Sequence, residues 1–340
     1  MRIVITGGAG FIGSNTAAHF LAEGHEIIVI DDLSRPGSEV NLAWLFEMDP
    51  NLAFYQIDMR DYAALRQALD KVKPIDILFH FAAQVAVTTS VSDPRLDFSV
   101  NALGTFNVLE AVRTLNLDPV ILFTSTNKVY GALESIVVIE DETRYRYRDL
   151  EKGVPETTPL DFYSPYGCSK GAADQYVHDY GRIYGLKTIV FRNSCIYGPR
   201  QFGVEDQGWL AWFIIAALKG RDITIYGNGK QVRDILHVSD LIRAMAAACR
   251  QEAAYGGIFN MGGGPQNSIS VWTEFSPILE KLLGRKLDIS RASWRPGDQN
   301  IYISDTTKAR QVLEWKPKFS VRDGIQDLFQ WVSSNLEIIG

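Results

Sequence analysis

Short apolar runs alternate with longer amphipathic stretches through the first 195 residues of the chain. The apolar runs are RIVIT (2–6), HEIIVID (25–31), LAFYQID (52–58), DILFHFAA (76–83), VILFTST (120–126) and KTIVFRNS (187–194). Helical periodicity falls between them, at roughly 11–23, 61–72, 96–116 and 166–184. Such alternation implies parallel strands joined by right-handed helical crossovers. The sequence therefore predicts an α/β fold built on a doubly wound parallel sheet.

The pattern loosens after YGPRQFG (197–203). Short strand-like segments, DITIYG (222–227) and KLDIS (286–290), mix with helical stretches near 207–219, 239–252, 270–284 and 320–336. We expect a first domain of residues 1–195 and a smaller α/β lobe of residues 196–340. Residues from about 234 to 263, with IFNMGG (258–263) as a candidate strand, are expected to return to the first domain. The polar segment 132–165 is too long for an ordinary connection and indicates a functional segment or a lid.

Composition narrows the range of partners. The 340 residues are 46% hydrophobic and 22% charged, with a formal net charge of −6 and no cluster of basic residues, which argues against nucleic acid or an anionic membrane surface. No apolar run approaches the roughly 20 residues of a membrane span. Cys168, Cys195 and Cys249 show no metal-like clustering with the histidines, so we expect a reduced, cytoplasmic setting and no metal site.

A glycine-rich turn, GGAGFIG, follows the first strand and opens the first helix. Gly7 permits a tight turn, Gly10 lets the backbone approach a pyrophosphate, and Gly13 lets the helix pack on the strand. The second strand ends in Asp31, where a carboxylate accepts hydrogen bonds from ribose hydroxyls and repels a 2′-phosphate. These features favour NAD and a Rossmann-type domain, although Arg35 in the next loop would suit a 2′-phosphate.

Two further strand ends extend this predicted nucleotide site. Asp58 ends the third strand and is placed to meet the adenine amino group. HFAAQ ends the fourth strand, and its small residues Ala82 and Ala83 would let a dinucleotide lie across the strand tips. Gln84 and the hydroxyls of Thr88 and Ser90 would then face the substrate.

Tyr166 and Lys170 are four residues apart in a predicted helix and therefore share one face. A nearby ammonium favours phenolate, so we expect the pKa of Tyr166 to be lowered and the tyrosine to act as a general base. The same lysine could bond the nicotinamide ribose. Thr126, just past the fifth strand, could hold the sugar oxygen that Tyr166 deprotonates.

Taken in order, these residues resemble the extended short-chain dehydrogenases/reductases that act on sugar nucleotides. The resemblance covers essentially the whole chain and is carried by GGAGFIG, Asp31, Asn101, Thr126, the Tyr166–Lys170 pair, RDILHV (233–238) and RPGD (295–298). It implies a tightly bound NAD that is regenerated in each turnover. The implied NAD-binding residues are Gly7, Gly10, Phe11, Ile12, Gly13, Asp31, Asp32, Leu33, Ser34, Arg35, Asp58, Met59, Phe81, Ala82, Ala83, Gln84, Asn101, Thr124, Tyr166 and Lys170.

Five segments are similar to those of family members that epimerise CDP-hexoses at C2. They are LSRPGSEVNLAWL, STNKVYG, SPYGCSKGAADQY, DQGWLAWF and GNGKQVRD. This similarity implies a CDP-sugar substrate, with Thr126, Tyr166 and Lys170 as catalytic residues and a 2-keto intermediate. The implied substrate-binding residues are Gln84, Thr88, Thr126, Asn193, Gln207, Arg233, Arg295 and Asp298.

One position departs from the family pattern. Many relatives have an asparagine where this chain has Cys195, and a thiol is a poor donor to the substrate diphosphate. Asn193 or Ser194 could take over that contact.

Alternative functions remain open at this point. A UDP-sugar 4-epimerase shares almost every residue named above, and a sensor protein that binds NAD without catalysis would share the scaffold. A 4,6-dehydratase needs an acid pair after the catalytic threonine, where this chain has Asn127 and Lys128.

We expect a homodimer or homotetramer, with the helices 96–116 and 166–184 as the contact surfaces. Trp209 and Trp212 are expected on a helix at the interface between the lobes.

Overall fold

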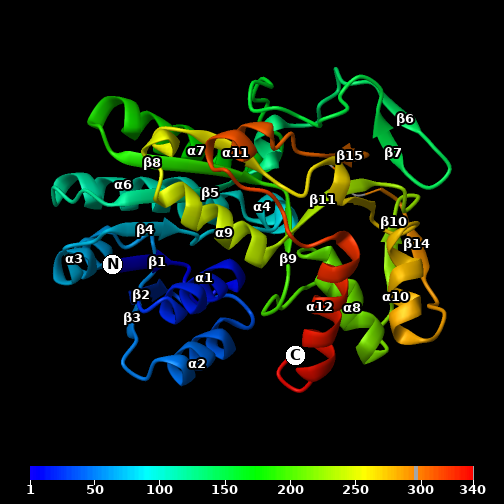
Figure 1. Ribbon diagram of the computed structural model, residues 1–340, viewed down its shortest axis with the longest axis horizontal. Helices are drawn as coiled ribbons and strands as arrows, with labels where there is room; N and C mark the ends of the chain where they lie inside the picture. Colours follow the sequence, from blue (N-terminus) through cyan, green and yellow to red (C-terminus); the bar gives the residue numbers. More distant parts are fainter. Residues whose placement is uncertain (295–297, 340) are drawn as a thin grey trace.

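The computed structural model describes residues 1–294 and 298–339. Its largest sheet has seven parallel strands in the order β12-β8-β5-β4-β1-β2-β3 (Figure 1). The strands are β1 (Arg2–Thr6), β2 (Glu26–Asp31), β3 (Ala53–Gln56), β4 (Ile77–His80), β5 (Val120–Thr126), β8 (Lys187–Asn193) and β12 (Ile258–Met261). The doubly wound parallel sheet predicted from the sequence is confirmed.

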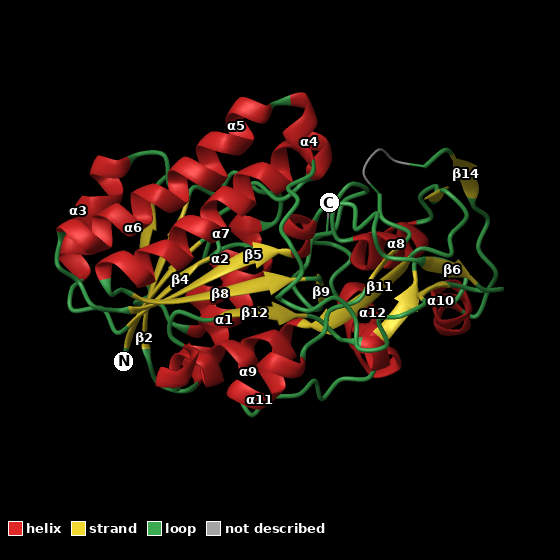
Figure 2. Ribbon diagram, turned by 90° about the horizontal axis from the view of Figure 1, so that it is seen from above, coloured by secondary structure: helices red, strands yellow, loops and turns green. Residues whose placement is uncertain are grey.

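Helices cover both faces of this sheet (Figure 2). One face packs against α1 (Phe11–Ala22), α2 (Ser38–Met48), α9 (Val238–Cys249) and α11 (Thr307–Val312). The other packs against α3 (Tyr62–Val72), α6 (Gly104–Thr114) and α7 (Ser164–Tyr184). Ile3 and Ile5 point into the first layer and Val4 into the second, because successive strand residues face opposite sides. Each such buried side chain contributes roughly 1.5–3 kcal/mol, which explains why the strands read as continuous apolar runs.

The predicted helix 96–116 is segmented in the structure. It consists of α5 (Pro94–Phe98), the π-helical turn η1 (Ser99–Leu103) and α6, and is preceded by the short helix α4 (Val87–Ser92). A 3-10 turn, η2 (Asn127–Tyr130), follows β5 directly. The turns η3 (Glu252–Ala254) and η4 (Pro265–Asn267) flank β12.

A second lobe lies beyond the carboxyl ends of the large sheet (Figure 1). Its helices are α8 (Trp209–Lys219), α10 (Phe275–Leu283) and α12 (Val321–Ser334). Its strands are β9 (Cys195–Tyr197), β10 (Thr224–Tyr226), β11 (Val232–His237), β13 (Ser268–Ser270), β14 (Ser290–Ala292) and β15 (Ile301–Tyr302). Trp209 and Trp212 pack against this lobe's apolar core. The predicted strand KLDIS is misplaced, since β14 shares only Ser290 with it.

The two parts of the chain exchange segments. The predicted strand in IFNMGG is confirmed as β12, which pairs with β8 at the edge of the large sheet. Helices α9 and α11 also pack on that sheet. We therefore propose a nucleotide-binding domain of residues 1–195 completed by α9, β12 and α11, with the remainder forming the second lobe.

Residues 132–165 contain a short hairpin and run into the start of α7. Strands β6 (Val138–Glu140) and β7 (Tyr145–Tyr147) pair antiparallel, and the Tyr147 hydroxyl donates to the Ile301 carbonyl at 3.1 Å. Arg144 forms an ion pair with Glu274 at 2.8 Å. None of these residues lines the cleft described below, so the structure does not support a lid over it. Within the described ranges, no helix is long and apolar enough to cross a membrane.

Candidate active site

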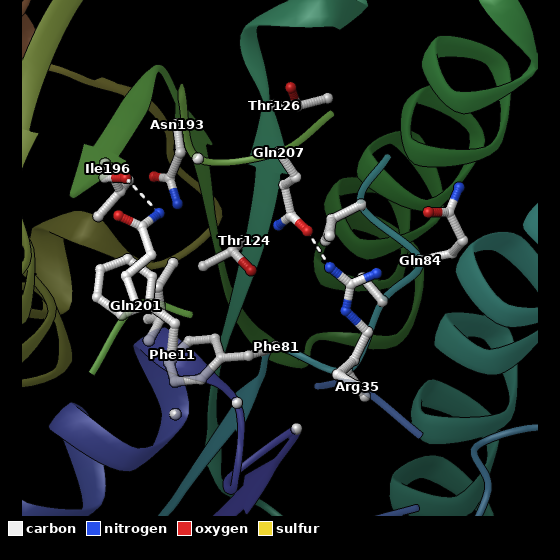
Figure 3. A pocket seen from close by; sticks show the side chains of 18 of the residues that line it. Phe11, Arg35, Phe81, Gln84, Thr124, Thr126, Asn193, Ile196, Gln201 and Gln207 are labelled. Atoms are coloured by element: carbon white, nitrogen blue, oxygen red, sulfur yellow. Dashed lines mark hydrogen bonds between the residues drawn. The ribbon is translucent and has the colours of Figure 1, made fainter. Parts of the chain in front are cut away.

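A cleft of about 690 Å³ runs along the carboxyl ends of the large sheet, and Ile196, Gln201 and Gln207 line it from the second part of the chain (Figure 3). All predicted NAD-binding residues line it except Leu33 and Asn101. Among the predicted substrate residues, Gln84, Thr126, Asn193 and Gln207 line the cleft, whereas Thr88, Arg233 and Asp298 do not. Arg295 lies outside the described residues. The structure therefore brings most of the predicted site into one cavity.

The glycine turn fits a dinucleotide for steric reasons. Gly7 has φ +70°, and a Cβ on it would lie 2.5 Å from the Ala82 nitrogen. A Cβ on Gly13 would lie 2.1 Å from the Gly7 carbonyl oxygen, so only glycine allows α1 to begin this close to β1. Gly10 caps α1 without a side-chain hydrogen bond. The first-turn N–H groups of α1 are consequently left for an anion such as a pyrophosphate.

Carboxylates stand at the ends of β2 and β3. Asp31 accepts hydrogen bonds from the Ala9 nitrogen at 3.0 Å and the Leu33 nitrogen at 2.9 Å, while burial raises its pKa. Leu33 does not line the cleft but packs against the apolar core. Asp58 is bound by the Arg60 guanidinium at 2.9 Å, and this hydrogen bond lowers its pKa. Asp31 thus suits a ribose, while Asp58 already has a strong partner.

Tyr166 and Lys170 lie in the first turns of α7 and are both buried. Burial raises the pKa of Tyr166 to about 12, and a hydrogen bond with Thr126 only partly opposes this effect. Burial also lowers the pKa of Lys170 to about 7. The Lys170 ammonium donates to the Thr124 carbonyl at 2.7 Å and lies 4.2 Å from the centre of the Phe123 ring. The expected lowering of the tyrosine pKa by this lysine is therefore wrong for this structure, because the ammonium is held by β5.

Asn101 and Gln84 belong to a buried network behind the cleft. Asn101 accepts from the Gln84 nitrogen at 2.9 Å and donates to the Gln84 carbonyl at 3.0 Å. The Gln84 side chain donates to the Ala86 carbonyl at 2.9 Å and to Asp97 at 2.8 Å. Asp97 also accepts from Ser169 at 2.5 Å. These contacts use the Gln84 amide that we expected to face the substrate, and they make Asn101 a support for the loop after β4.

The substrate side of the cleft contains both predicted and unexpected polar groups. Arg35 and Gln207 form a hydrogen bond across the cleft (Figure 3). Thr88 donates to Asp206, a cleft residue, at 3.1 Å. Four buried cleft side chains each have an oxygen with no partner in the described structure: Asn41, Ser125, Asn193 and Gln201. Unpaired buried oxygens are costly, so these atoms suit a polar ligand. Neither periodicity nor a motif pointed to Ser125 and Gln201 as site residues.

Ser194 and Asn193 were predicted to supply the diphosphate donor that is missing at Cys195, and the structure treats them differently. The Ser194 hydroxyl donates to the carboxylate of Asp234 and to its carbonyl at 3.1 Å, so it is already engaged. Asn193 lies beside Gln201 at the cleft (Figure 3). The unpartnered buried atom of Asn193 is its side-chain oxygen, an acceptor, so only its amide N–H could donate to a phosphate.

The loop after β5 carries no carboxylate. Asn127 accepts from the Thr126 hydroxyl at 3.3 Å, and the Lys128 nitrogen donates to the same hydroxyl oxygen at 3.2 Å. Both Asn127 and Lys128 line the cleft. Across residues 1–294 and 298–339, no group of His, Cys, Asp and Glu side chains is arranged to hold a metal ion.

This fold, with a glycine-turn cleft and a Thr–Tyr–Lys set, defines an extended short-chain dehydrogenase/reductase. The family model described as GDP-mannose 4,6 dehydratase matches residues 4–328, and the chain belongs to that family of NAD-dependent sugar-nucleotide epimerases and dehydratases. CDP-paratose 2-epimerase of Salmonella typhi is 45% identical over 340 residues, covering 98% of this chain and 100% of that protein. A putative UDP-glucose 4-epimerase of Methanocaldococcus jannaschii is 31% identical over 98% of this chain and 99% of its own length.

Solved structures agree with this assignment. The UDP-glucose 4-epimerase of Thermotoga maritima with UDP-glucose is 30% identical, with a TM-score of 0.86 over 99% of this chain and 100% of that one. The Thermus thermophilus UDP-glucose 4-epimerase in complex with NAD is 32% identical, with a TM-score of 0.80 over 98% and 99% of the two chains. The protein is an NAD-dependent sugar-nucleotide epimerase, an isomerase.

Proposed function

We propose that the protein interconverts CDP-hexoses that differ in configuration at C2, of the CDP-paratose/CDP-tyvelose or CDP-glucose/CDP-mannose type. The observation that carries the proposal is the loop after β5, where Thr126 shares the cleft with Tyr166 and is followed by Asn127 and Lys128. Elimination of water needs an acid and a base at those two positions, whereas hydride removal and return does not. The 45% identity with a CDP-paratose 2-epimerase supports the choice of nucleotide and carbon.

The residues that would hold NAD are those of the glycine turn, Asp31, the Ala82–Ala83 strand tip and Lys170. When bound, NAD supplies a hydride acceptor and donor, so that C2 passes through a ketone and is reduced again. To act as the base, Tyr166 must be the phenolate, which burial disfavours in the protein alone and which the positive charge of oxidised NAD would favour. Its oxygen would then take the proton of the C2 hydroxyl as that carbon is oxidised and return it when the carbon is reduced. Thr126, hydrogen-bonded to Tyr166, orients the same oxygen. Inversion of C2 would require the sugar to present its other face to the cofactor between oxidation and reduction.

The test of the reaction is label transfer at C2. CDP-glucose deuterated at C2 is incubated with the purified protein, and the isotope content of the epimer is measured by mass spectrometry. We expect the label to be retained at C2. Complete washout into solvent would point to proton abstraction and contradict the proposed mechanism.

Tyr166→Phe tests the assignment of the base. Removing the phenol oxygen should lower turnover about 100-fold or more, because general base catalysis contributes roughly 10²–10⁴-fold. Bound NAD, measured by absorbance after denaturation, should stay close to the wild-type content. Unchanged turnover in this variant would remove Tyr166 from the mechanism.

A 4-epimerase acting on a UDP-sugar is the second candidate, favoured by the likeness to UDP-glucose 4-epimerases. Parallel assays with CDP-glucose, CDP-paratose and UDP-glucose separate the two. Turnover of UDP-glucose alone would replace the first proposal with this one.

We further propose that the working unit is a homodimer or homotetramer built on the helices η1–α6 and α7.

A further inference from the structure

Lys128 is a cleft residue with no role in the hydride mechanism. It belongs to η2, and its backbone nitrogen is fixed by the Thr126 hydroxyl at 3.2 Å. Among the described residues, its partly buried ammonium has one acceptor, the Gln299 side-chain oxygen at 3.5 Å. Gln299 is itself held in place, since its side-chain nitrogen donates to the Gly131 carbonyl at 2.5 Å. An ammonium has three donors, so this group can bind further acceptors in the cleft.

The charges around Lys128 leave a surplus of positive charge. Arg233 repels it and Asp298 attracts it, and these two residues form their own ion pair at 2.5 Å. That pair is largely buried, with side-chain exposures of 10% and 25%. Because the pair neutralises itself, Lys128 is the charge at this corner that has no ion-pair partner within residues 1–294 and 298–339. An anionic ligand group is the natural partner of such a charge.

The same corner contains Cys195, where the family resemblance implies an asparagine. Cys195 on β9 feels the positive charges of both Arg233 and Lys128, which oppose the burial that raises the pKa of its thiol. By that resemblance, an asparagine at this position would offer its amide as a donor to the substrate diphosphate. A thiol is a weak donor, and the neighbouring Ser194 hydroxyl is engaged by Asp234. The cleft therefore lacks a strong donor at position 195 and has an extra cation beside it.

We propose that the Lys128 ammonium binds a phosphate oxygen of the substrate diphosphate and replaces the amide donor that relatives have at the position of Cys195. The inference rests on the proposed function only in requiring a nucleoside diphosphate sugar as substrate. It gives Lys128 a binding role, distinct from the acid–base role of the carboxylates in dehydratases.

Titration of Lys128 provides an independent signature. Burial, with repulsion from Arg233, lowers the pKa of Lys128 to about 8, and Asp298 opposes the shift. Affinity for a diphosphate should therefore fall as pH rises above about 8, when the ammonium loses its proton. The neighbouring Cys195 thiol does not titrate in the same way, since burial raises its pKa further above neutrality.

The test is calorimetric titration of the NAD-loaded enzyme with CDP. We expect Lys128→Met to weaken CDP binding about ten- to a hundred-fold, the range of a charge-assisted hydrogen bond. Lys128→Arg should keep most of the affinity and lose the decline above pH 8. Lys286→Met, which removes a lysine with 91% side-chain exposure, is the matched control and should leave CDP binding unchanged.

A second substitution tests the replacement itself. Cys195→Asn in the Lys128→Met background restores an amide donor at the corner and should recover at least part of the lost CDP affinity. Recovery would support the exchange of donors, whereas a folded double variant that binds CDP no better than Lys128→Met would contradict it.

Two further outcomes are decisive. If Lys128→Met binds CDP normally but binds CDP-glucose weakly, the lysine contacts the hexose and the proposal is overturned. If the variant loses affinity for CDP and UDP alike while the wild type turns over only UDP-glucose, the CDP-hexose function fails and the diphosphate contact stands.

Discussion

Burying the charged side chain of Lys170 lowers the free energy of unfolding, and the size of this effect depends on pH. Its pKa is lowered by burial from an ordinary value near 10.5 to about 7 in the folded protein. Between these values the unfolded chain holds the proton and the folded chain does not, so this residue makes stability rise with pH from 7 to 10. We predict that Lys170→Met gains stability relative to wild type at pH 7 and that the gain shrinks by about 2 kcal/mol by pH 9.

Denaturant unfolding of both proteins with NAD removed, at pH 7, 8 and 9, measures this difference. Lys152→Met, which removes an exposed lysine, should show no such trend and serves as the control. A stability difference between Lys170→Met and wild type that stays constant with pH would mean that Lys170 keeps its proton throughout. The same variant should lose turnover, since Lys170 is proposed to position the cofactor.

At the level of single residues, the sequence could place side chains on an element but not fix their partners. The four-residue spacing of Tyr166 and Lys170 correctly put both at the cleft. It could not show that the ammonium would bond the Thr124 carbonyl, because that contact depends on how closely α7 packs on β5. Gln84 lines the cleft as predicted, yet Asp97 on a separate helix binds its amide.

Two glycines in the turn between β1 and α1 are expected to have different roles. Gly13 should matter for folding stability and Gly10 for cofactor binding. A Cβ at Gly13 would overlap the Gly7 carbonyl at 2.1 Å, while a Cβ at Gly10 would lie 3.2 Å from that same oxygen. Gly10 also has φ −70°, which any residue can adopt. We predict that Gly13→Ala destabilises the protein by about 2 kcal/mol or more, since such overlap forces the backbone to move. Gly10→Ala should fold normally and lose NAD.

Thermal unfolding and the absorbance of released NAD measure these two effects separately. Gly24→Ala is a useful control because Gly24 has φ +78° but no atom within 4 Å of the added Cβ, so only backbone strain acts there. Full retention of NAD by Gly10→Ala would mean that the pyrophosphate does not approach this turn.

The sequence predicted helices and strands correctly where their buried residues are apolar. The strands of the large sheet are buried on both faces and therefore read as apolar runs. Helix α2 was not predicted, because two of its four buried residues, Ser38 and Asn41, are polar and disguise its periodicity. The short strand β14 is exposed throughout, so apolar patterning could not locate it. The sequence signal thus fails where an element is held by polar contacts or lies at the surface.

At the scale of the whole molecule, one helical face has an aromatic surface with no described partner. Phe98, Tyr176 and Tyr184 are 59%, 48% and 50% exposed, and Ile183 beside them is 66% exposed. Figure 2 shows α4, α5, α6 and α7 together on this side of the sheet. Tyr176 and Tyr184 belong to a chain of aromatic contacts that runs through Tyr180. Large exposed apolar groups gathered on one face indicate an interface.

We predict that a second copy of the chain covers this face. Light scattering after size-exclusion chromatography should give a dimer or tetramer, and Tyr176→Glu combined with Phe98→Glu should weaken association about 100-fold or more, since a buried unpaired charge costs several kcal/mol. Phe46→Glu on α2, at a residue 37% exposed on the opposite helical layer, should leave the assembly intact. Because Tyr166 and Lys170 lie on the same helix as Tyr176, dissociation should also lower the thermal stability of the catalytic helix. A wild-type protein that stays monomeric at high concentration would rule out this interface and leave the aromatic face without a partner of its own kind.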